Sequence, residues 1–331
     1  MALFTSFTNE IKNLQLSLSK NSLTLQWCVQ AMTLLKKLHS EFLLIILEKS
    51  NVPFTWINDN LLNLYMKESL NIMELCNMLK SSSFKINMYH LTVDATMKNL
   101  NNYEAESFSN MQSIVQRDSK RILIPEMQLR DCCSSLICTI RVAMSLLSYI
   151  LLSVFLYPTK NYKLEEVDRI CCNSSPTKSF RDSIDELATE FQRKFCKDGE
   201  KWMIGFPEYE EMEKAIMQVK EKLKRGYGED EEEIKKNKDV MLQKSKALKA
   251  GLEKFESQVN LVFEEVLKGR NKLLHMIGIS KIRGSKDCPG MEIRGYNQEK
   301  LEDEKNRENR ILGGRVAIFI YAVNNDYNEY L

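Results

Sequence analysis

The chain has 331 residues, 44% of them hydrophobic, which is enough for one large domain or two ordinary ones with a sizeable core. Its 47 basic and 45 acidic residues nearly balance, which excludes a dominant electrostatic attraction to nucleic acid. No glycine precedes Gly199, and glycine-rich phosphate loops are absent from the sequence. Since hairpins and tight turns need residues that tolerate positive φ, residues 1–198 are predicted to be helices joined by polar turns.

Cysteine and histidine usage argues against a metal or cofactor site. The nine cysteines are an odd number in a long chain without a secretory signal, so we interpret them as reduced thiols. The three histidines lie far apart, and neither adjacent cysteine pair has zinc-ligand spacing. We expect no metal, no cofactor and a cytoplasmic protein. The N-terminus carries one acid, Glu10, among many Ser and Thr residues, so a plastid transit peptide is the alternative to an ordinary first helix.

Apolar side chains at spacings of three and four predict helices along the first third of the chain. The stripe over residues 23–48 consists of Trp27, Ala31, Leu34, Leu38, Phe42 and Ile45. A second helix, capped at Asn58–Asp59, carries Leu61, Tyr65, Ile72, Cys76 and Leu79. We expect it to end at the serines of residues 81–83, and further helices to occupy residues 84–104 and 107–121.

Residues 132–156 form the least polar stretch and allow two interpretations. Their length suits a membrane span, but Arg141 lies close to the middle, where a charge is unfavourable in lipid. The candidate membrane or buried positions are Val142, Leu146, Ile150 and Leu156. A narrow polar stripe, made of Ser134, Arg141, Ser145 and Ser148, also suits the centre of a helical bundle. We favour a buried central helix that starts at Pro125 and ends at Pro158, with membrane association as the alternative.

Helices are expected again over residues 178–196 and around Met212 to Leu223, followed by a charged turn over residues 226–239. Beyond this turn, apolar residues recur every 3.5 positions and predict a coiled-coil-like seam. This predicted seam consists of Leu248, Leu252, Phe255, Val259, Val262 and Val266. The seam suits a coiled coil or an antiparallel hairpin, and its partner is expected to be a helix of the same chain. Residues 278–315 contain six of the twelve glycines, many charges and little periodicity, which predicts a loosely ordered tail at 278–331 after a helical domain at 1–277.

Two stretches carry a resemblance to a known family. LTLQWCVQAMTLLKKLHSE, from Leu23 to Glu41, resembles the N-terminal signature of the plant BYPASS family, matched at Trp27, Ala31, Met32, Leu38, His39, Ser40 and Glu41. The next helix resembles that family's second segment at Tyr65, Ser69, Met73, Glu74, Leu75, Cys76 and Asn77. The string from Arg270 to Leu274 is also similar, so the resemblance covers residues 1 to about 277. It implies a regulatory protein of shoot and root development that restrains a root-derived mobile signal and has no established enzymatic reaction.

No set of residues in the sequence has the pattern of a catalytic site. His39 and Glu41 are two positions apart and face different sides of a helix, so we expect His39 at the surface or in a capping role. Trp27 and Trp56 are interpreted as core anchors. We therefore expect an all-α, multi-helix bundle with long antiparallel helices, which acts by binding protein partners and is not an enzyme. The alternatives are a membrane-associated tether and an enzyme that acts on an apolar metabolite.

Overall fold

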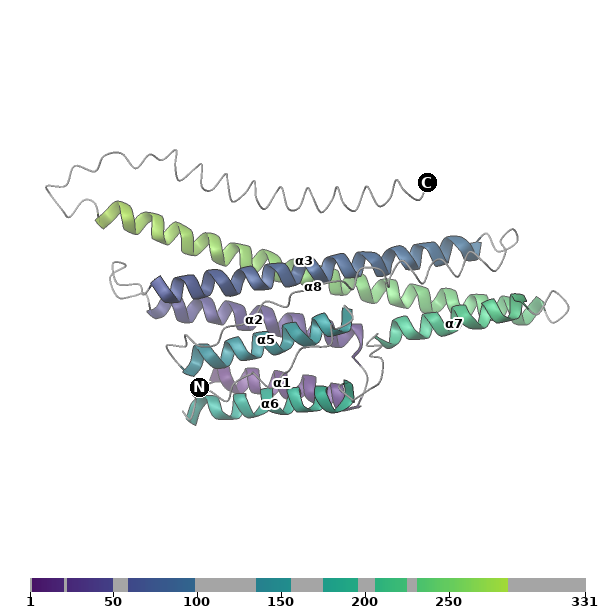
Figure 1. The fold of residues 1–331 in the computed structure, drawn as a ribbon, viewed down its shortest axis with the longest axis horizontal. Coiled ribbons are helices and arrows are strands. Elements are labelled where there is room, and N and C mark those ends of the chain that lie inside the picture. The colour runs from purple at the N-terminus through teal and green to yellow at the C-terminus, as the bar shows by residue number, and fades with distance from the viewer. Residues whose placement is uncertain are drawn as a thin grey trace. The chain divides into compact units, whose positions relative to one another are not determined.

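A computed structural model of the chain describes residues 2–20, 23–49, 59–98, 135–155, 175–195, 206–224 and 231–284. These residues form seven helices and no strand, which confirms the predicted all-α bundle (Figure 1). The chain divides into two compact units, Met1–Gly278 and Ile279–Leu331. The last helix, α8 (Glu231–Gly284), crosses the boundary between these units.

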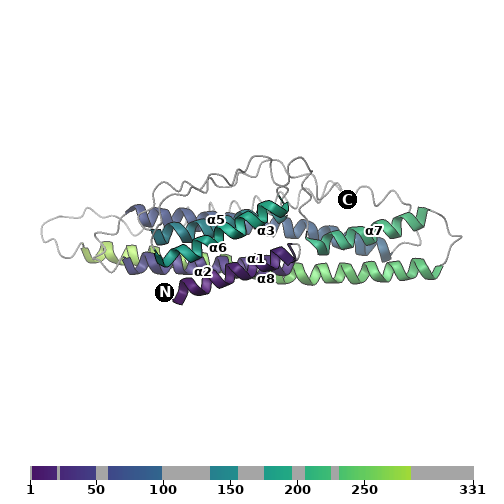
Figure 2. The same ribbon diagram turned by 90° about the horizontal axis from the view of Figure 1, so that it is seen from below.

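Four shorter helices pack around one apolar core in the first unit. Helix α1 (Ala2–Lys20) packs on α6 (Ser175–Phe195), and α2 (Leu25–Lys49) packs on α5 (Ser135–Phe155). Helix α5 also contacts α6 and α3 (Asp59–Lys98), which makes it the central element of this group (Figure 2). Phe7 of α1 packs on Phe180 of α6, since their ring centroids lie 5.9 Å apart.

Side chains from distant helices satisfy the ends of α1 and α2. Thr24 caps α2, since its Oγ1 accepts the backbone N–H of Trp27 at 3.1 Å. Glu208 of the later helix α7 (Pro207–Lys224) accepts the backbone N–H of Leu25 at 3.1 Å. At the C-terminus of α1, Lys194 Nζ donates to the carbonyl oxygen of Leu18 in the last turn, at 2.5 Å. Acidic groups at helix N-termini and basic groups at C-termini also complement the helix dipole, so both contacts stabilise the bundle.

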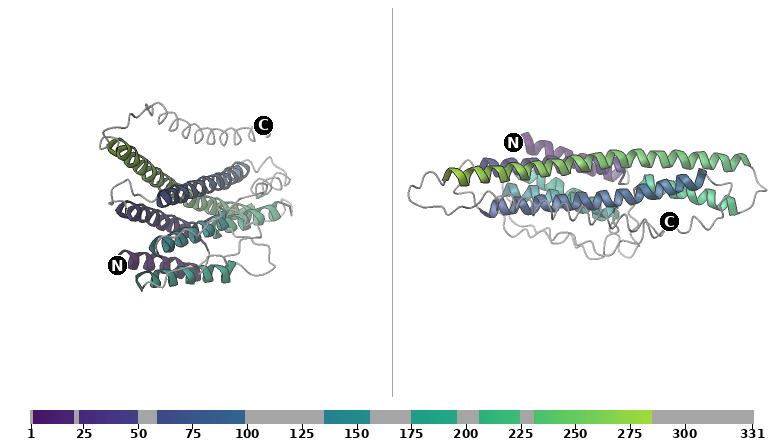
Figure 3. Two further views of the ribbon diagram at one scale, coloured as in Figure 1. Left: turned by 60° about the vertical axis from the view of Figure 1, so that its left-hand side comes forward. Right: turned by 90° about the horizontal axis from the view of Figure 1, so that it is seen from above.

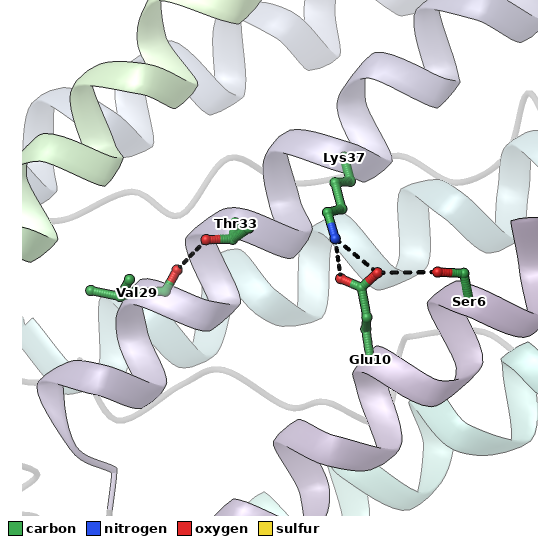
Figure 4. Close-up of polar contacts among 5 residues, drawn as sticks. All are labelled: Ser6, Glu10, Val29, Thr33 and Lys37. Carbon is green, nitrogen blue, oxygen red and sulfur yellow. Dashed lines mark hydrogen bonds and ion pairs between the residues drawn. The ribbon is translucent and has the colours of Figure 1, made fainter.

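Helices α1 and α2 form an ion pair at the surface of their contact, whereas the buried part of this contact is apolar. Lys37 Nζ donates to both carboxylate oxygens of Glu10 at 3.0 Å, and Ser6 Oγ donates to the same carboxylate at 3.3 Å (Figure 4). Exposed pairs of this kind contribute little to stability. Below them Trp27 is buried, as expected of a core anchor, and its Nε1 donates to the carbonyl oxygen of Leu14 at 3.0 Å.

Helices α3 and α8 are longer than the sequence patterns indicate. Residues 81–83 were expected to end a helix, but α3 continues through them, so that prediction and the separate helix at 84–104 are wrong. Ser82 and Ser83 are buried, and Ser83 Oγ donates to Glu256 of α8 at 2.6 Å, so tertiary contacts use the hydroxyl that the turn prediction relied on. Residues 107–121 lie outside the described part of the chain.

The charged segment before the predicted seam is helical as well. Helix α8 begins at Glu231, inside the turn predicted for residues 226–239. Glu231 and Lys235 are four residues apart, as are Glu232 and Lys236, a spacing at which opposite charges support a helix. Helix α7 (Pro207–Lys224) lies beside this part of α8, where Lys244 Nζ donates to Glu211 at 2.6 Å (Figure 3).

Helix α5 contains most of the candidate membrane segment. Within the described residues, Leu136–Phe155 is the single helical stretch long and apolar enough to cross a membrane, and 83% of its most apolar window is buried inside the protein. Leu146 and Ile150 are buried, Val142 is partly buried, and Leu156 lies outside the described residues, as do the predicted helix ends at Pro125 and Pro158.

The cysteines differ from the prediction at one described position. Cys28 and Cys76 are free, buried thiols, and burial raises the pKa of both. Cys138 in the first turn of α5 is instead disulfide-bonded. The prediction of nine reduced thiols is therefore wrong at Cys138.

Candidate functional site: the polar positions of the α3–α8 seam

The two long helices pair in antiparallel orientation through matching 3.5-residue repeats. On α8 the repeat extends the predicted seam in both directions, and every member is buried: Met241, Ser245, Leu248, Leu252, Phe255, Val259, Val262, Val266, Gly269 and Leu273. The facing repeat on α3 is also buried throughout: Tyr65, Ser69, Ile72, Cys76, Leu79, Ser83, Ile86, His90 and Val93. We call these two rows together the α3–α8 seam.

Hydrogen bonds fix the register of this seam. Arg270 Nη1 donates to Ser69 Oγ at 2.8 Å, Ser83 Oγ donates to Glu256 at 2.6 Å, and Ser245 Oγ lies 2.5 Å from His90 Nδ1. Residue numbers rise along α3 as they fall along α8, which defines the antiparallel pairing. Polar residues at seam positions specify register, because a shifted alignment leaves them buried without partners.

A buried ion pair joins α3 to the central helix. Arg141 of α5 and Glu68 of α3 are both 1% exposed, and Arg141 Nε and Nη2 donate to Glu68 Oε1 at 2.9 and 2.6 Å. Within the predicted polar stripe of α5, Arg141 therefore bonds to α3, whereas Ser148 is partly buried and its Oγ donates to the Met144 carbonyl oxygen of its own helix. Removing either charge would break this pair while the other charge stays buried, which is strongly destabilising.

A second polar cluster lies at the α8 N-terminal part of the seam. Ser245 Oγ contacts His90 Nδ1 and also Asp94 Oδ1, the latter at 2.8 Å, while His90 Nε2 lies 3.8 Å from Asp94 Oδ2. Serine, histidine and aspartate are the residue types of a hydrolytic triad, but here the aspartate bonds the serine itself. Ser245 is also fully buried in the helix contact. The arrangement is that of an interhelical hydrogen-bond network.

The third polar position is a pair of aromatic side chains at the other end of the seam. His39 of α2 is 1% exposed, against the expectation of a surface or capping role, and its ring centroid lies 5.4 Å from that of Tyr65. Neither His39 nitrogen nor the Tyr65 hydroxyl has a hydrogen-bond partner among the described residues. Burial lowers the pKa of His39 to about 4 and raises that of Tyr65, because both charged forms would be desolvated.

Gly269 supplies the space that the Tyr65 hydroxyl occupies. A Cβ at this position would collide with Tyr65 Oη and lie 3.0 Å from Leu43 Cδ2. We expect Gly269→Ala to lower the free energy of unfolding by about 1 to 3 kcal/mol through overpacking, although alanine is the better helix former. In a Tyr65→Phe background the penalty should shrink, because the colliding hydroxyl is gone. Urea unfolding of the two single variants and the double variant measures this coupling, and equal penalties in both backgrounds would contradict it.

The buried imidazole of His39 predicts an acid-sensitive stability. Its folded-state pKa of about 4 is below the ordinary 6.5, so the unfolded chain binds the proton more readily. The stabilising contribution is complete above pH 6.5 and should fall by roughly 3 kcal/mol as the pH drops from 6.5 to about 4. His39→Leu removes this term, so the difference in unfolding free energy between wild type and variant should change with pH by that amount. The exposed His275 provides the control, and a pH-independent difference for His39→Leu would refute the prediction.

Among the described residues, no three His, Cys, Asp or Glu side chains gather as a metal site.

All six predicted seam residues are buried. The residues that the sequence reasoning missed are Glu68, His90, Asp94, Ser245 and Gly269. Ser245, Gly269 and His90 continue the same 3.5-residue repeats, so extending the pattern past its apolar members would have found them. Glu68 and Asp94 each lie one residue from a seam position, next to Ser69 and Val93, and carry no comparable signal.

Comparison with known proteins leaves the resemblance to the BYPASS family as a prediction. No protein-family model, no curated protein and no solved structure matches the chain. What the geometry supports on its own is a helical bundle whose polar groups connect its longest helices.

Proposed function

We propose that the protein is a non-enzymatic helical scaffold that acts by binding protein partners, in a developmental role of the kind that the BYPASS resemblance implies. One observation carries the first part of the proposal. Among the described residues, four groups suited to acid–base or nucleophilic chemistry, Glu68, His39, His90 and Ser245, are each at most 1% exposed. A substrate would reach them only after the helices separate, whereas a scaffold needs such groups only to hold its register.

Binding to a partner should depend on the folded bundle, and the Arg141–Glu68 pair supplies a matched set of variants. Affinity purification from plant tissue with the wild-type chain should recover a recurrent protein that also binds the purified chain directly. This binding should be lost in Glu68→Leu, which removes the carboxylate that Arg141 bonds on α3, and retained in the double variant Glu68→Leu/Arg141→Leu, which removes both charges. Failure to recover any direct binder, together with turnover of an apolar metabolite by the purified chain, would favour an enzyme instead.

A membrane-associated tether is the second candidate, because α5 has the length and apolarity of a span. The burial of α5 and its ion pair to α3 favour the scaffold, since a lipid-inserted α5 would separate Arg141 from Glu68. Carbonate extraction of membranes from expressing cells distinguishes the two. The scaffold should be released into the supernatant, whereas a tether should stay in the pellet and leave it when Leu147 and Ile150 are replaced by Asp.

A further inference from the structure

The cluster of His90, Asp94 and Ser245 has a defined hydrogen-bond direction. As a carboxylate, Asp94 can only accept, so the Ser245 hydroxyl donates to its Oδ1 across 2.8 Å. The Ser245 oxygen then accepts from His90, whose neutral ring must carry its proton on Nδ1, 2.5 Å away. The chain of donors therefore runs from α3 into α8 and back to α3, and in the neutral ring Nε2 of His90 carries no proton.

A proton added to the neutral His90 binds to Nε2, where nearby carboxylates favour the positive charge and a lysine opposes it. Asp94 Oδ2 lies 3.8 Å from this nitrogen and favours the charge, as does Glu253 of α8, while Lys249 of α8 opposes it. From α7, Glu211 is paired with Lys244 at 2.6 Å, and Glu213 acts on the neighbouring Tyr89. Burial outweighs the attraction of Asp94, and the pKa of His90 is lowered.

The two partners of His90 differ in their access to water. His90 and Ser245 are buried in the seam, whereas the Asp94 side chain is 26% exposed. An imidazolium can be hydrated here if the last turns of α3 move away from α8. Local separation of this kind requires less free energy than global unfolding when it involves the end of a helix pair, and α3 ends at Lys98, eight residues after His90.

We propose that His90, Asp94 and Ser245 form an acid-sensitive latch, in which protonation of His90 opens the contact between the C-terminal part of α3 and α8. The sign follows from linkage. The open form, in which His90 is hydrated, takes up the proton near the ordinary pKa, whereas the closed form resists it. Acidification below pH 6.5 therefore shifts the latch toward the open form, and neutral pH closes it.

Hydrogen exchange at two pH values tests the latch on the full chain. After correction for the intrinsic pH dependence of exchange, the opening constant for backbone amides at residues 241–249 should rise several-fold between pH 7.5 and 5.5. The upper limit is about tenfold, because an open-state histidine of pKa 6.5 gains no more than that factor at pH 5.5. In His90→Gln, whose amide can still donate to Ser245 but does not titrate, the corrected opening constant should not change with pH.

A second measurement keeps the test decisive if the variant folds poorly. NMR titration of the wild-type imidazoles should place the His90 midpoint below 6.5, and the exchange of residues 241–249 should follow this midpoint. Amides of α2 around His39 should respond to pH equally in wild type and His90→Gln, which separates the latch from the buried His39. A His90 midpoint at or above 6.5, or the same pH response of residues 241–249 in wild type and His90→Gln, would overturn the latch.

Discussion

Replacing Arg141 or Glu68 alone by leucine should lower the free energy of unfolding by about 3 to 5 kcal/mol, because each change removes one member of a buried ion pair and leaves the other charge in the interior. Both side chains are 1% exposed, so water cannot compensate for the loss. The double variant Arg141→Leu/Glu68→Leu should be near wild type or more stable, since two desolvated charges become apolar side chains. Urea unfolding of the three variants measures the coupling directly.

The exposed pair Lys37–Glu10 provides the control for this cycle. Its side chains are 49% and 28% exposed, so a Lys37→Met change should alter stability by at most about 1 kcal/mol. Single Arg141 and Glu68 variants that behave like this surface pair would show that the interior contact is hydrated or absent in solution. Their large effects together with a benign double variant would establish that α5 is held inside the bundle by this pair.

Replacing Val259 by aspartate should destabilise the chain by several kcal/mol, roughly 3 or more. Val259 is 1% exposed near the middle of the α3–α8 seam, and an aspartate there would be buried without a counter-charge. Phe255→Asp should have a similar or larger effect, because the Phe255 ring also stacks on Phe155 of α5 at a centroid distance of 4.4 Å. Thermal or urea unfolding monitored by circular dichroism measures both.

The matched control for the seam is two residues away on the same helix. Leu261 is 45% exposed, so Leu261→Asp introduces the same charge at the surface of α8 and should change stability by about 0.5 kcal/mol or less. Equal unfolding midpoints for Val259→Asp and Leu261→Asp would mean that the seam is open to solvent, and the antiparallel pairing of α3 with α8 would be wrong.

The sequence alone determined the helical class and the places where the core helices lie. The lack of glycine before Gly199 and the apolar spacings of three and four from Trp27 to Ile45 are local properties of the sequence. They predict helices without any knowledge of the fold. The apolar members of the seam from Leu248 to Val266 followed in the same way. These features could be predicted because each apolar stripe must be buried against something, whichever helix covers it.

Only the tertiary structure decided what the polar residues do. Ser83 belongs to a run of three serines that is typical of a helix end. Its hydroxyl nevertheless bonds to Glu256, 173 residues away, and α3 continues. Arg141 could have been a charge in a membrane span or an exposed edge, and its partner Glu68 lies 73 residues before it. A charged or hydroxyl side chain is stable at the surface or in the interior according to whether a partner meets it there. That partner comes from another helix, and no periodicity within a single helix contains this information.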